Sequence, residues 1–366
     1  MNRPPFIIDT DVHDDLKGPA DLFPYLEKYW IEVIKLSGLP VPFHGYRSPV
    51  GVKRYDATPP DGGIPGSDPA HLISHYLDAN GIDIAILTGG ILIGASLFPD
   101  RHFANAAISA YNEHLADHWL SLSDRFRGSI YINHSDPEHA AKEITRKAVD
   151  KRFVQVMMPS ASRMLLGQKF YHPIYRAAEN HGLPVAFHPG VESAGVSGPP
   201  TPSGYPSSYF EWHNIIPTNF MAQINSLVCE GVFELFPKLR IVGVEGGIGW
   251  LPTLMWRMDK NWKALRASTP WLKRAPSEYI IEHVRLTTQP IEEPEKSLHL
   301  LQMLEMAHAE QTVMFSSDYP HWDNDSPMHA MPKLPQALME RIYYKNAAEL
   351  YGIEVPVLNE AAVADV

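Results

Sequence analysis

The sequence predicts a single (β/α)8 TIM barrel with long loops inserted at its carboxyl face. Short apolar, β-branched runs alternate with longer helical patterns along the 366 residues, which is typical of repeated βα units. Ionisable residues stand where several of these runs end, namely Asp11, His13, His188, Glu245 and Asp318. Because such barrels keep their chemistry at the carboxyl ends of their strands, this placement predicts an active site there.

Eight runs have the length and composition of buried parallel strands. They cover residues 6–10, 82–88, 128–133, 153–157, 184–188, 240–245, 283–288 and 312–318. Helices are expected between them, for example over residues 103–123 and 137–149. The second of these helices should begin with Asp136 as N-cap and Pro137 at its first position. The number of strands matches a closed barrel.

One domain is expected over residues 1–366, because barrels with insertions exceed the usual domain length. Two stretches do not fit a minimal barrel: residues 17–69, rich in Pro and Gly, and residues 190–217, which contain Pro199-Pro200-Thr201-Pro202 and several aromatic residues. We expect both insertions to cover or shape the active site. The alternative is that they form peripheral surface or contacts between subunits.

Composition and charge narrow the class of protein. A formal net charge of -11 without a run of Lys or Arg argues against a nucleic-acid partner. No segment approaches the continuous apolar length of a membrane span. The single cysteine, Cys229, excludes an intrachain disulfide, and the first five residues lack the apolar stretch of a signal peptide. We therefore expect a cytoplasmic protein.

The first predicted strand leads into polar residues that share one side of the chain. Strand side chains alternate, so Asp9, Asp11 and His13 point the same way. Asp11 and His13 could hold a divalent ion, because carboxylate oxygen and imidazole nitrogen are ligands of zinc and manganese. Asp and His after a strand are also common turn formers and helix caps, so a structural role is the alternative.

Two further strands deliver an ionisable side chain to their carboxyl ends. Val185-Ala186-Phe187-His188-Pro189-Gly190 is an apolar run that ends in a histidine, which must find polar partners. A buried histidine bonded to backbone carbonyls is the alternative. Thr312-Val313-Met314-Phe315-Ser316-Ser317-Asp318 likewise ends in an acid.

These motifs together resemble the amidohydrolase superfamily. The resemblance is carried by Asp11-Val12-His13, Phe187-His188-Pro189-Gly190 and Ser317-Asp318-Tyr319-Pro320-His321-Trp322, and it covers nearly the whole chain. The most similar branch is the amidohydrolase-related group, which includes aminocarboxymuconate-semialdehyde decarboxylase and the non-oxidative aromatic acid decarboxylases.

The resemblance implies one divalent metal ion, zinc or manganese, held by Asp11, His13, His188 and Asp318. Many members have histidine at the position of Asp11, and the carboxylate here favours the harder ion. The branch also has a histidine followed by two glycines where this chain has Glu245-Gly246-Gly247. Glu245 could act as a general acid or base, bind the metal, or only hydrogen-bond a neighbouring strand or loop.

Three hypotheses for function follow. In the first, a metal-activated water attacks an amide, ester or carbon–carbon-linked carbonyl of a small compound, which we expect to be aromatic, and Asp318 or Glu245 passes a proton to the leaving group. In the alternative, Asp318 protonates a ring carbon of an aromatic or unsaturated acid, and carbon dioxide departs. In a different class altogether, the chain is a catalytically impaired binding protein, because fold does not determine function.

Additional residues are expected around the site. His321 could orient the substrate or another side chain, or cap the following loop. His213, Tyr209 and Trp212 could form an aromatic wall for a flat substrate, or pack between subunits. We expect a small-molecule substrate and a homo-oligomer, either a dimer or a tetramer. A strongly anionic substrate would need cations from the loops, such as Arg47, Lys53, Arg54 or Arg163.

Overall fold

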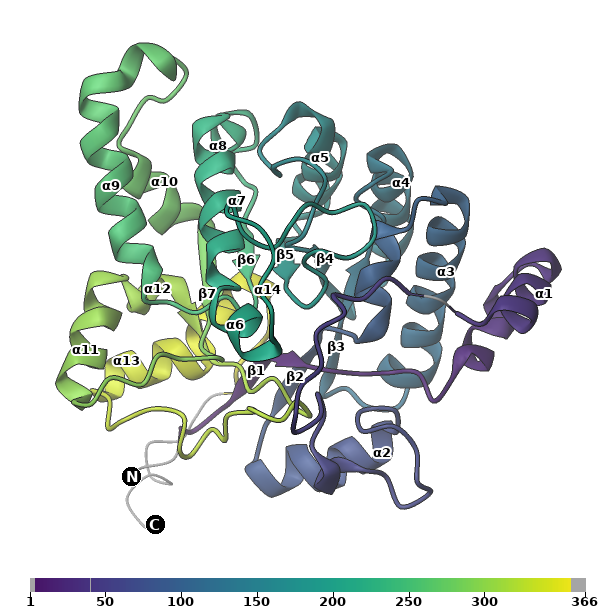
Figure 1. Ribbon diagram of the computed structural model, residues 1–366. Helices are drawn as coiled ribbons and strands as arrows, with labels where there is room; N and C mark the ends of the chain where they lie inside the picture. Colours follow the sequence, from purple (N-terminus) through teal and green to yellow (C-terminus); the bar gives the residue numbers. More distant parts are fainter. Residues whose placement is uncertain (1–3, 40, 357–366) are drawn as a thin grey trace.

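Eight parallel strands form one sheet in chain order in the computed structural model, which describes residues 4–39 and 41–356 (Figure 1). They are β1 (Ile8–Val12), β2 (Ile84–Leu87), β3 (Phe126–Tyr131), β4 (Phe153–Pro159), β5 (Val185–His188), β6 (Ile241–Gly243), β7 (Val284–Thr287) and β8 (Val313–Met314). The chain after β8 returns to β1, where the Thr10 amide donates to the Phe315 carbonyl (3.0 Å) and the Asp318 amide donates to the Asp11 carbonyl (3.0 Å). The predicted (β/α)8 barrel is confirmed.

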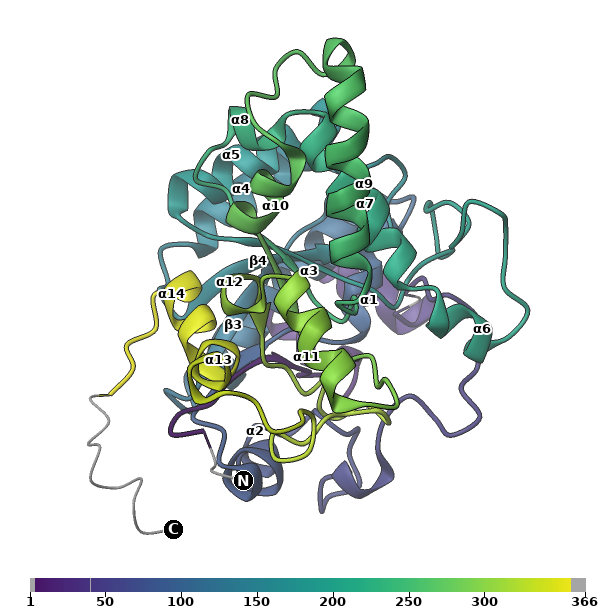
Figure 2. The same ribbon diagram turned by 90° about the vertical axis from the view of Figure 1, so that its left-hand side faces the viewer.

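Helices surround the sheet (Figures 1 and 2). The α-helices are α1 (Lys28–Ser37), α2 (Pro69–Leu72), α3 (Arg101–His114), α4 (Pro137–Lys147), α5 (His172–His181), α6 (Tyr209–Asn214), α7 (Pro217–Cys229), α8 (Val232–Leu235), α9 (Trp250–Leu265), α10 (Pro276–His283), α11 (Ser297–Met306), α12 (Ala309–Thr312), α13 (Gln336–Glu340) and α14 (Asn346–Tyr351). Short 3-10 or π segments are η1 (Pro19–Tyr25), η2 (Tyr55–Ala57), η3 (Ile73–Asp78), η4 (Ile91–Leu97), η5 (Leu115–Leu120), η6 (Lys169–Tyr171), η7 (Arg266–Ser268) and η8 (Arg341–Lys345).

All eight predicted strands are present, but several ends differ from the prediction. β1 extends to Val12, so that Asp11 lies within the strand. β6 stops at Gly243 because Glu245 has a φ of 58°, which a strand residue does not adopt. β8 is short because the Phe315 amide turns away and donates to the Ile342 carbonyl (2.8 Å).

The predicted start of α4 is confirmed. The Asp136 side chain accepts a hydrogen bond from the His139 amide (3.3 Å), and Pro137 is the first helical residue. The strands that α4 helps to cover are buried on both faces, and side chains such as Ile130 and Val156 are completely inaccessible. This packing explains why the strands are continuous apolar runs in the sequence.

The two insertions meet the loop after β8. The first, residues 17–69, contains η1, α1 and η2, and the second, residues 190–217, contains α6. The Arg54 amide donates to the Pro320 carbonyl (2.8 Å), and the Trp322 amide donates to the Val52 carbonyl (3.0 Å). The rings of His44 and Trp212, one from each insertion, stack with centroids 4.1 Å apart. Both insertions therefore lie at the carboxyl end of the barrel.

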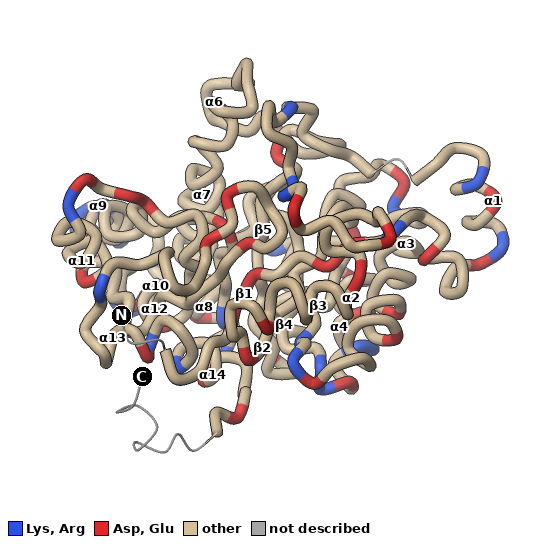
Figure 3. Tube along the Cα trace, turned by 90° about the horizontal axis from the view of Figure 1, so that it is seen from below, with Lys and Arg blue, Asp and Glu red and all other residues tan. Residues whose placement is uncertain are grey.

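No helix in the part of the chain that the structure describes combines the length and the apolar character required to cross a bilayer. Lys and Arg alternate with Asp and Glu along the outer elements (Figure 3). Opposite charges are therefore interspersed over this side of the molecule.

Candidate metal centre

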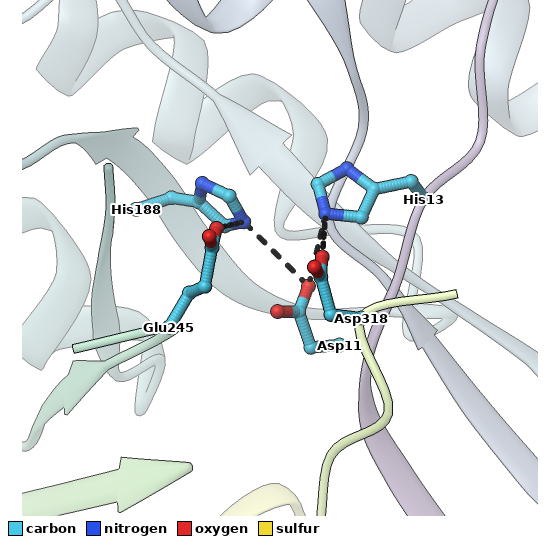
Figure 4. A group of neighbouring side chains, drawn as sticks. All are labelled: Asp11, His13, His188, Glu245 and Asp318. Carbon is cyan, nitrogen blue, oxygen red and sulfur yellow. Dashed lines mark ion pairs between the residues drawn. The ribbon is translucent and has the colours of Figure 1, made fainter. Parts of the chain in front are cut away.

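Five buried side chains converge at the carboxyl end of the barrel (Figure 4). They come from four strands or the loops that follow them: Asp11 and His13 at β1, His188 at β5, Glu245 after β6 and Asp318 after β8. One ligand atom of each lies within 4.8 Å of the others, and no member of the group is more than 8% exposed. The structure thus brings together the four predicted ligands and Glu245.

Both histidines direct Nε2 into this cluster. Nδ1 of His13 contacts the Gly89 carbonyl, and Nδ1 of His188 lies 2.9 Å from the Pro189 carbonyl. A carbonyl only accepts hydrogen bonds, so Nδ1 carries a proton in each ring and Nε2 is the nitrogen left to bind an ion. Neither Nε2 has a hydrogen-bond partner. This is the arrangement in which histidine binds a metal ion, with its other nitrogen oriented by a carbonyl.

The aspartates also keep an oxygen free. Asp11 Oδ1 accepts from the Thr88 hydroxyl (2.6 Å), and Asp318 Oδ1 accepts from Nδ1 of His321 (2.7 Å) and lies 2.8 Å from Nε2 of His13. Oδ2 of both aspartates is buried without a hydrogen-bond partner. Buried carboxylate oxygens without partners are unfavourable, so a cation bound here would satisfy them.

Two of the carboxylates project from strained backbone. Glu245 and Asp318 have φ values of 58° and 64°, in the left-handed region that residues other than glycine rarely adopt. Hydrogen bonds hold both, from the Glu245 amide to the Thr287 hydroxyl (3.0 Å) and from the Asp318 amide to the Asp11 carbonyl (3.0 Å). Such conformations cluster at functional sites, where the surrounding structure holds them in place.

The electrostatics of the cluster favour a cation. Burial raises the pKa of Asp318 well above its usual value, and the charges of Glu245 and Asp11 raise it further. Burial also raises the pKa of Glu245, although His188 opposes this effect. Burial lowers the pKa of His13 to about 4. Burial alone would lower the pKa of His188, but the neighbouring Asp11 and Glu245 raise it to about 9. Three carboxyl groups and two imidazoles fit one divalent ion such as zinc or manganese, which would replace the protons, and the predominance of oxygen donors suits manganese.

His321 supports Asp318 from outside the cluster. Besides its bond to Asp318, its ring packs against that of His13 with centroids 4.1 Å apart. Its backbone pairs with that of Lys53 from the first insertion, whose ammonium group donates to Asp15 (2.5 Å) and to the Pro65 carbonyl (2.8 Å). His321 is therefore hydrogen-bonded to Asp318, and Lys53 is in an ion pair with Asp15.

A pocket of about 190 Å³ opens beside Glu245. Its wall is formed mainly by apolar residues and contains two carboxylates but no Lys or Arg: His213, Asn214, Ile216, Pro217, Glu245, Gly247, Pro290, Ile291 and Glu292. The Glu292 carboxylate accepts from the Gly249 amide (2.7 Å) at the start of α9. Glu245 alone belongs to both the metal cluster and the pocket wall.

The predicted aromatic wall is only partly at this pocket. His213 lines it, with Nε2 3.6 Å from Asp323 Oδ2. Tyr209 is not among the lining residues, and its ring stacks on that of His213 with centroids 5.5 Å apart. Trp212 does not reach the pocket, because it is 3% exposed and stacks on His44. Trp212 instead packs between the insertions, and its contact with a substrate stays a prediction.

Sequence reasoning missed two residues that support the cluster, Thr88 and Gly89, both directly after β2. Thr88 donates to Asp11, and the Gly89 carbonyl accepts from His13. Gly89 has a φ of 75°, and a Cβ added there would overlap the Tyr131 hydroxyl. The signal was a polar residue followed by two glycines at a strand end, which is too common to single out.

Comparison with known proteins identifies the family. A family model described as amidohydrolase matches residues 8–353. The chain belongs to the amidohydrolase family. The resemblance inferred from the motifs is thereby confirmed, and the chain is a member of a family of enzymes.

The individual proteins that the chain resembles have low sequence identity to it. Gamma-resorcylate decarboxylase of Rhodococcus jostii is 27% identical over 277 residues, which cover 70% of this chain and 79% of that protein. The crystal structure of 2,6-dihydroxybenzoate decarboxylase from Rhizobium has 20% identity and a TM-score of 0.67, covering 95% of this chain and 99% of that one. A third similar structure is the 5-carboxyvanillate decarboxylase of Novosphingobium aromaticivorans, complexed with manganese and 4-hydroxy-3-methoxy-5-nitrobenzoic acid. It has 20% identity and a TM-score of 0.69, covering 95% of this chain and 96% of that one. These structural similarities show the fold alone.

Proposed function

We propose that this chain is a manganese-dependent decarboxylase that removes the carboxylate of a phenolic aromatic acid without oxidation. The sequence analysis placed hydrolysis first and decarboxylation second. The curated relative at 27% identity and the similar solved structures are decarboxylases, and they favour the second hypothesis.

The observation that supports this proposal most directly is the environment of Asp318. Non-oxidative decarboxylation needs an acid that gives a proton to the ring carbon bearing the carboxylate. Asp318 is completely buried, and burial together with the charge of Glu245 raises its pKa. His321 donates to Oδ1, while Oδ2 has no partner. A buried acid that keeps its proton and has one free oxygen is suited to this transfer.

The residues of the metal cluster and His321 would have different roles in the reaction. Asp11, His13, His188 and Asp318, with Glu245 beside them, would hold the ion, which would supply positive charge to neutralise the substrate carboxylate and polarise an adjacent hydroxyl. Asp318 gives its proton to the ring carbon. The bond from that carbon to the carboxylate then breaks, its electron pair restores the aromatic ring, and carbon dioxide leaves. His321 keeps the Asp318 carboxyl oriented throughout.

The pocket supports a small substrate with one carboxylate. Its volume of about 190 Å³ is below the ~300 Å³ at which pockets for drug-sized ligands begin, so it suits a single ring. Apolar side chains such as Ile216 and Ile291 would contact the ring faces. Because the wall contains Glu245 and Glu292 and no cation, a second carboxylate on the substrate would be repelled.

The test combines product analysis with isotope labelling. Manganese-loaded protein is incubated in D2O with 2,6-dihydroxybenzoate and 2-hydroxybenzoate, and carbon dioxide and the phenolic product are measured. We expect carbon dioxide in equal amount to a phenol that carries one deuterium at the former carboxylate position. The same protein is incubated with 4-nitrophenyl acetate and with benzamides. Hydrolysis of these compounds without any release of carbon dioxide from the acids would restore the hydrolase hypothesis.

A further inference from the structure

A second pocket, of about 450 Å³, lies at the carboxyl end of the barrel and shares no lining residue with the pocket beside Glu245. Its volume is within the range of ~300–1,000 Å³ that is typical of small-molecule sites. Its lining combines aromatic rings, aliphatic groups and two arginines: Phe98, Pro99, Arg101, Ser135, Arg163, Met164, Phe170, Tyr171 and Val196.

The walls are joined by hydrogen bonds between segments that are distant in the sequence. The pocket residues follow β2, β3 and β4, and Val196 comes from the second insertion. The Val196 amide donates to the Leu97 carbonyl (3.0 Å), and the Ser135 hydroxyl donates to the Ser96 carbonyl (2.6 Å). The Tyr171 hydroxyl donates to the Met164 carbonyl (3.1 Å). The pocket is therefore a formed feature of the barrel and not a gap between independent loops.

One part of the lining is aromatic. Phe98, Phe170 and Tyr171 contribute their rings, and Phe170 remains 39% exposed. The rings of Phe170 and Tyr171 are nearly perpendicular, with an interplanar angle of 84°. Such a surface favours a flat apolar group, because aromatic side chains pack well in offset and edge-to-face arrangements.

The arginines provide the charge. Most arginines of the described residues bind a carboxylate, a carbonyl oxygen or a ring, as Arg146 binds Glu143 and Arg266 covers Trp262. The side chains of Arg101 and Arg163 make no hydrogen bond, ion pair or ring contact within the described chain, although the charge of Arg101 acts on Asp136 at longer range. Both arginines line the same pocket, and guanidinium groups are suited to binding a carboxylate.

We propose that this pocket binds an aromatic carboxylate, with the ring against Phe98, Phe170 and Tyr171 and the carboxylate between Arg101 and Arg163. The site is separate from the metal centre and does not depend on the proposed decarboxylase activity. It differs from the pocket beside Glu245 in charge, since that wall contains two glutamates and no cation. An anionic ligand without a metal is therefore accepted at the second pocket and repelled at the first.

The experiment is a fluorine NMR titration of 4-fluorobenzoate with the full chain after removal of metal by a chelator. We expect saturable binding by the wild type, and at least about ten-fold weaker binding for the Arg101→Gln Arg163→Gln double variant, because a hydrogen bond to a charged group contributes about this factor. Arg257→Gln, which replaces another arginine without a partner, on α9, is the matched control and should bind as the wild type does. Arg101, Arg163 and Arg257 are all exposed, and circular dichroism verifies that the variants fold.

Two further measurements make the outcome decisive. The neutral analogue 4-fluorobenzamide should bind at least about ten-fold more weakly than the acid, since it offers the guanidinium groups no charge. Phe170→Ala should weaken binding of the acid through loss of ring contact. The proposal is overturned if the wild type does not bind the acid, if the double variant binds it equally well, or if the amide binds as tightly as the acid. Because turnover is not measured, these results are independent of any failure to detect decarboxylation.

Discussion

The charge of the five-residue cluster leads to a quantitative prediction for Glu245→Gln in metal-free protein. Glu245 is 8% exposed, and its Oε2 lies 3.4 Å from Nε2 of His188. Burial raises the pKa of Glu245 well above its usual 4.5; His188 opposes this increase and Asp11 adds to it. The folded protein therefore keeps a proton on this carboxyl at pH values where the unfolded chain has released it.

The sign follows from this difference in proton binding. The folded state binds more protons than the unfolded state, so stability falls as the pH rises above 4.5, until the pH reaches the folded-state pKa. The slope is about 1.4 kcal/mol per pH unit. Glutamine has nearly the same shape and does not ionise. We therefore expect the variant to gain about 1.4 kcal/mol of unfolding free energy over the wild type for each pH unit above about 5, up to the folded-state pKa of Glu245.

The assay is urea unfolding followed by tryptophan fluorescence, which the 8 tryptophans of the chain permit. Chelated samples are compared with samples in excess manganese. Manganese at 100 times its dissociation constant should stabilise the wild type by about 2.7 kcal/mol, and the variant by less. Glu143→Gln is the control: Glu143 is 4% exposed and accepts bonds from Arg146 and Asn112, so its replacement should destabilise the protein. The reasoning is refuted if the two metal-free pH profiles run parallel, or if manganese stabilises the variant as much as the wild type.

Three other perturbations have expected outcomes. Asp318→Asn should lower the rate of carbon dioxide release by about 10²- to 10⁴-fold, the contribution of a positioned acid, and a preparation with unchanged turnover would exclude Asp318 as proton donor. Gly89→Ala should reduce bound manganese, measured by elemental mass spectrometry, because its Cβ would overlap Tyr131, whereas Gly352→Ala, with open space around its Cβ, should not. Burial lowers the pKa of His134 to about 4, so its contribution to stability is complete above pH 6.5. The free energy of unfolding should fall by about 1.4 kcal/mol per pH unit as the pH decreases from 6.5 towards 4. In metal-free His134→Asn, urea unfolding should not show this decrease in the free energy of unfolding at low pH. The same pH dependence in the variant and the wild type would contradict the prediction.

The metal-ligand motifs do not distinguish hydrolysis from decarboxylation. Asp11, His13, His188 and Asp318 serve hydrolysis and decarboxylation equally, because both need a cation and a proton donor. The absence of the expected histidine at the position of Glu245 weakened the match to the decarboxylases, and Glu245 could give a proton to a leaving group, so hydrolysis was placed first. Similarity over most of the chain carried more information than that single position, and it favours decarboxylation.

The barrel and the residue types of the site could be determined from the sequence by itself. Strands buried on both faces must be short, continuous apolar runs, and each run was recognisable without knowledge of its neighbours. An ionisable residue at the end of such a run must find a partner, which marked His188 and Asp318 as candidates for function. Both signals are local, since they depend on residues only a few positions apart.

Only the tertiary structure decided how these residues act. Closure of β8 onto β1 brings Asp318 and Asp11 together from opposite ends of the chain. The Gly89 carbonyl selects the protonated nitrogen of His13, and the left-handed conformation of Glu245 directs its carboxylate to both the cluster and the pocket. Burial of Trp212 against His44 likewise joins two separate insertions. These contacts link positions far apart in the sequence, and their geometry exists only after the barrel has closed, so no local pattern of residues specifies them.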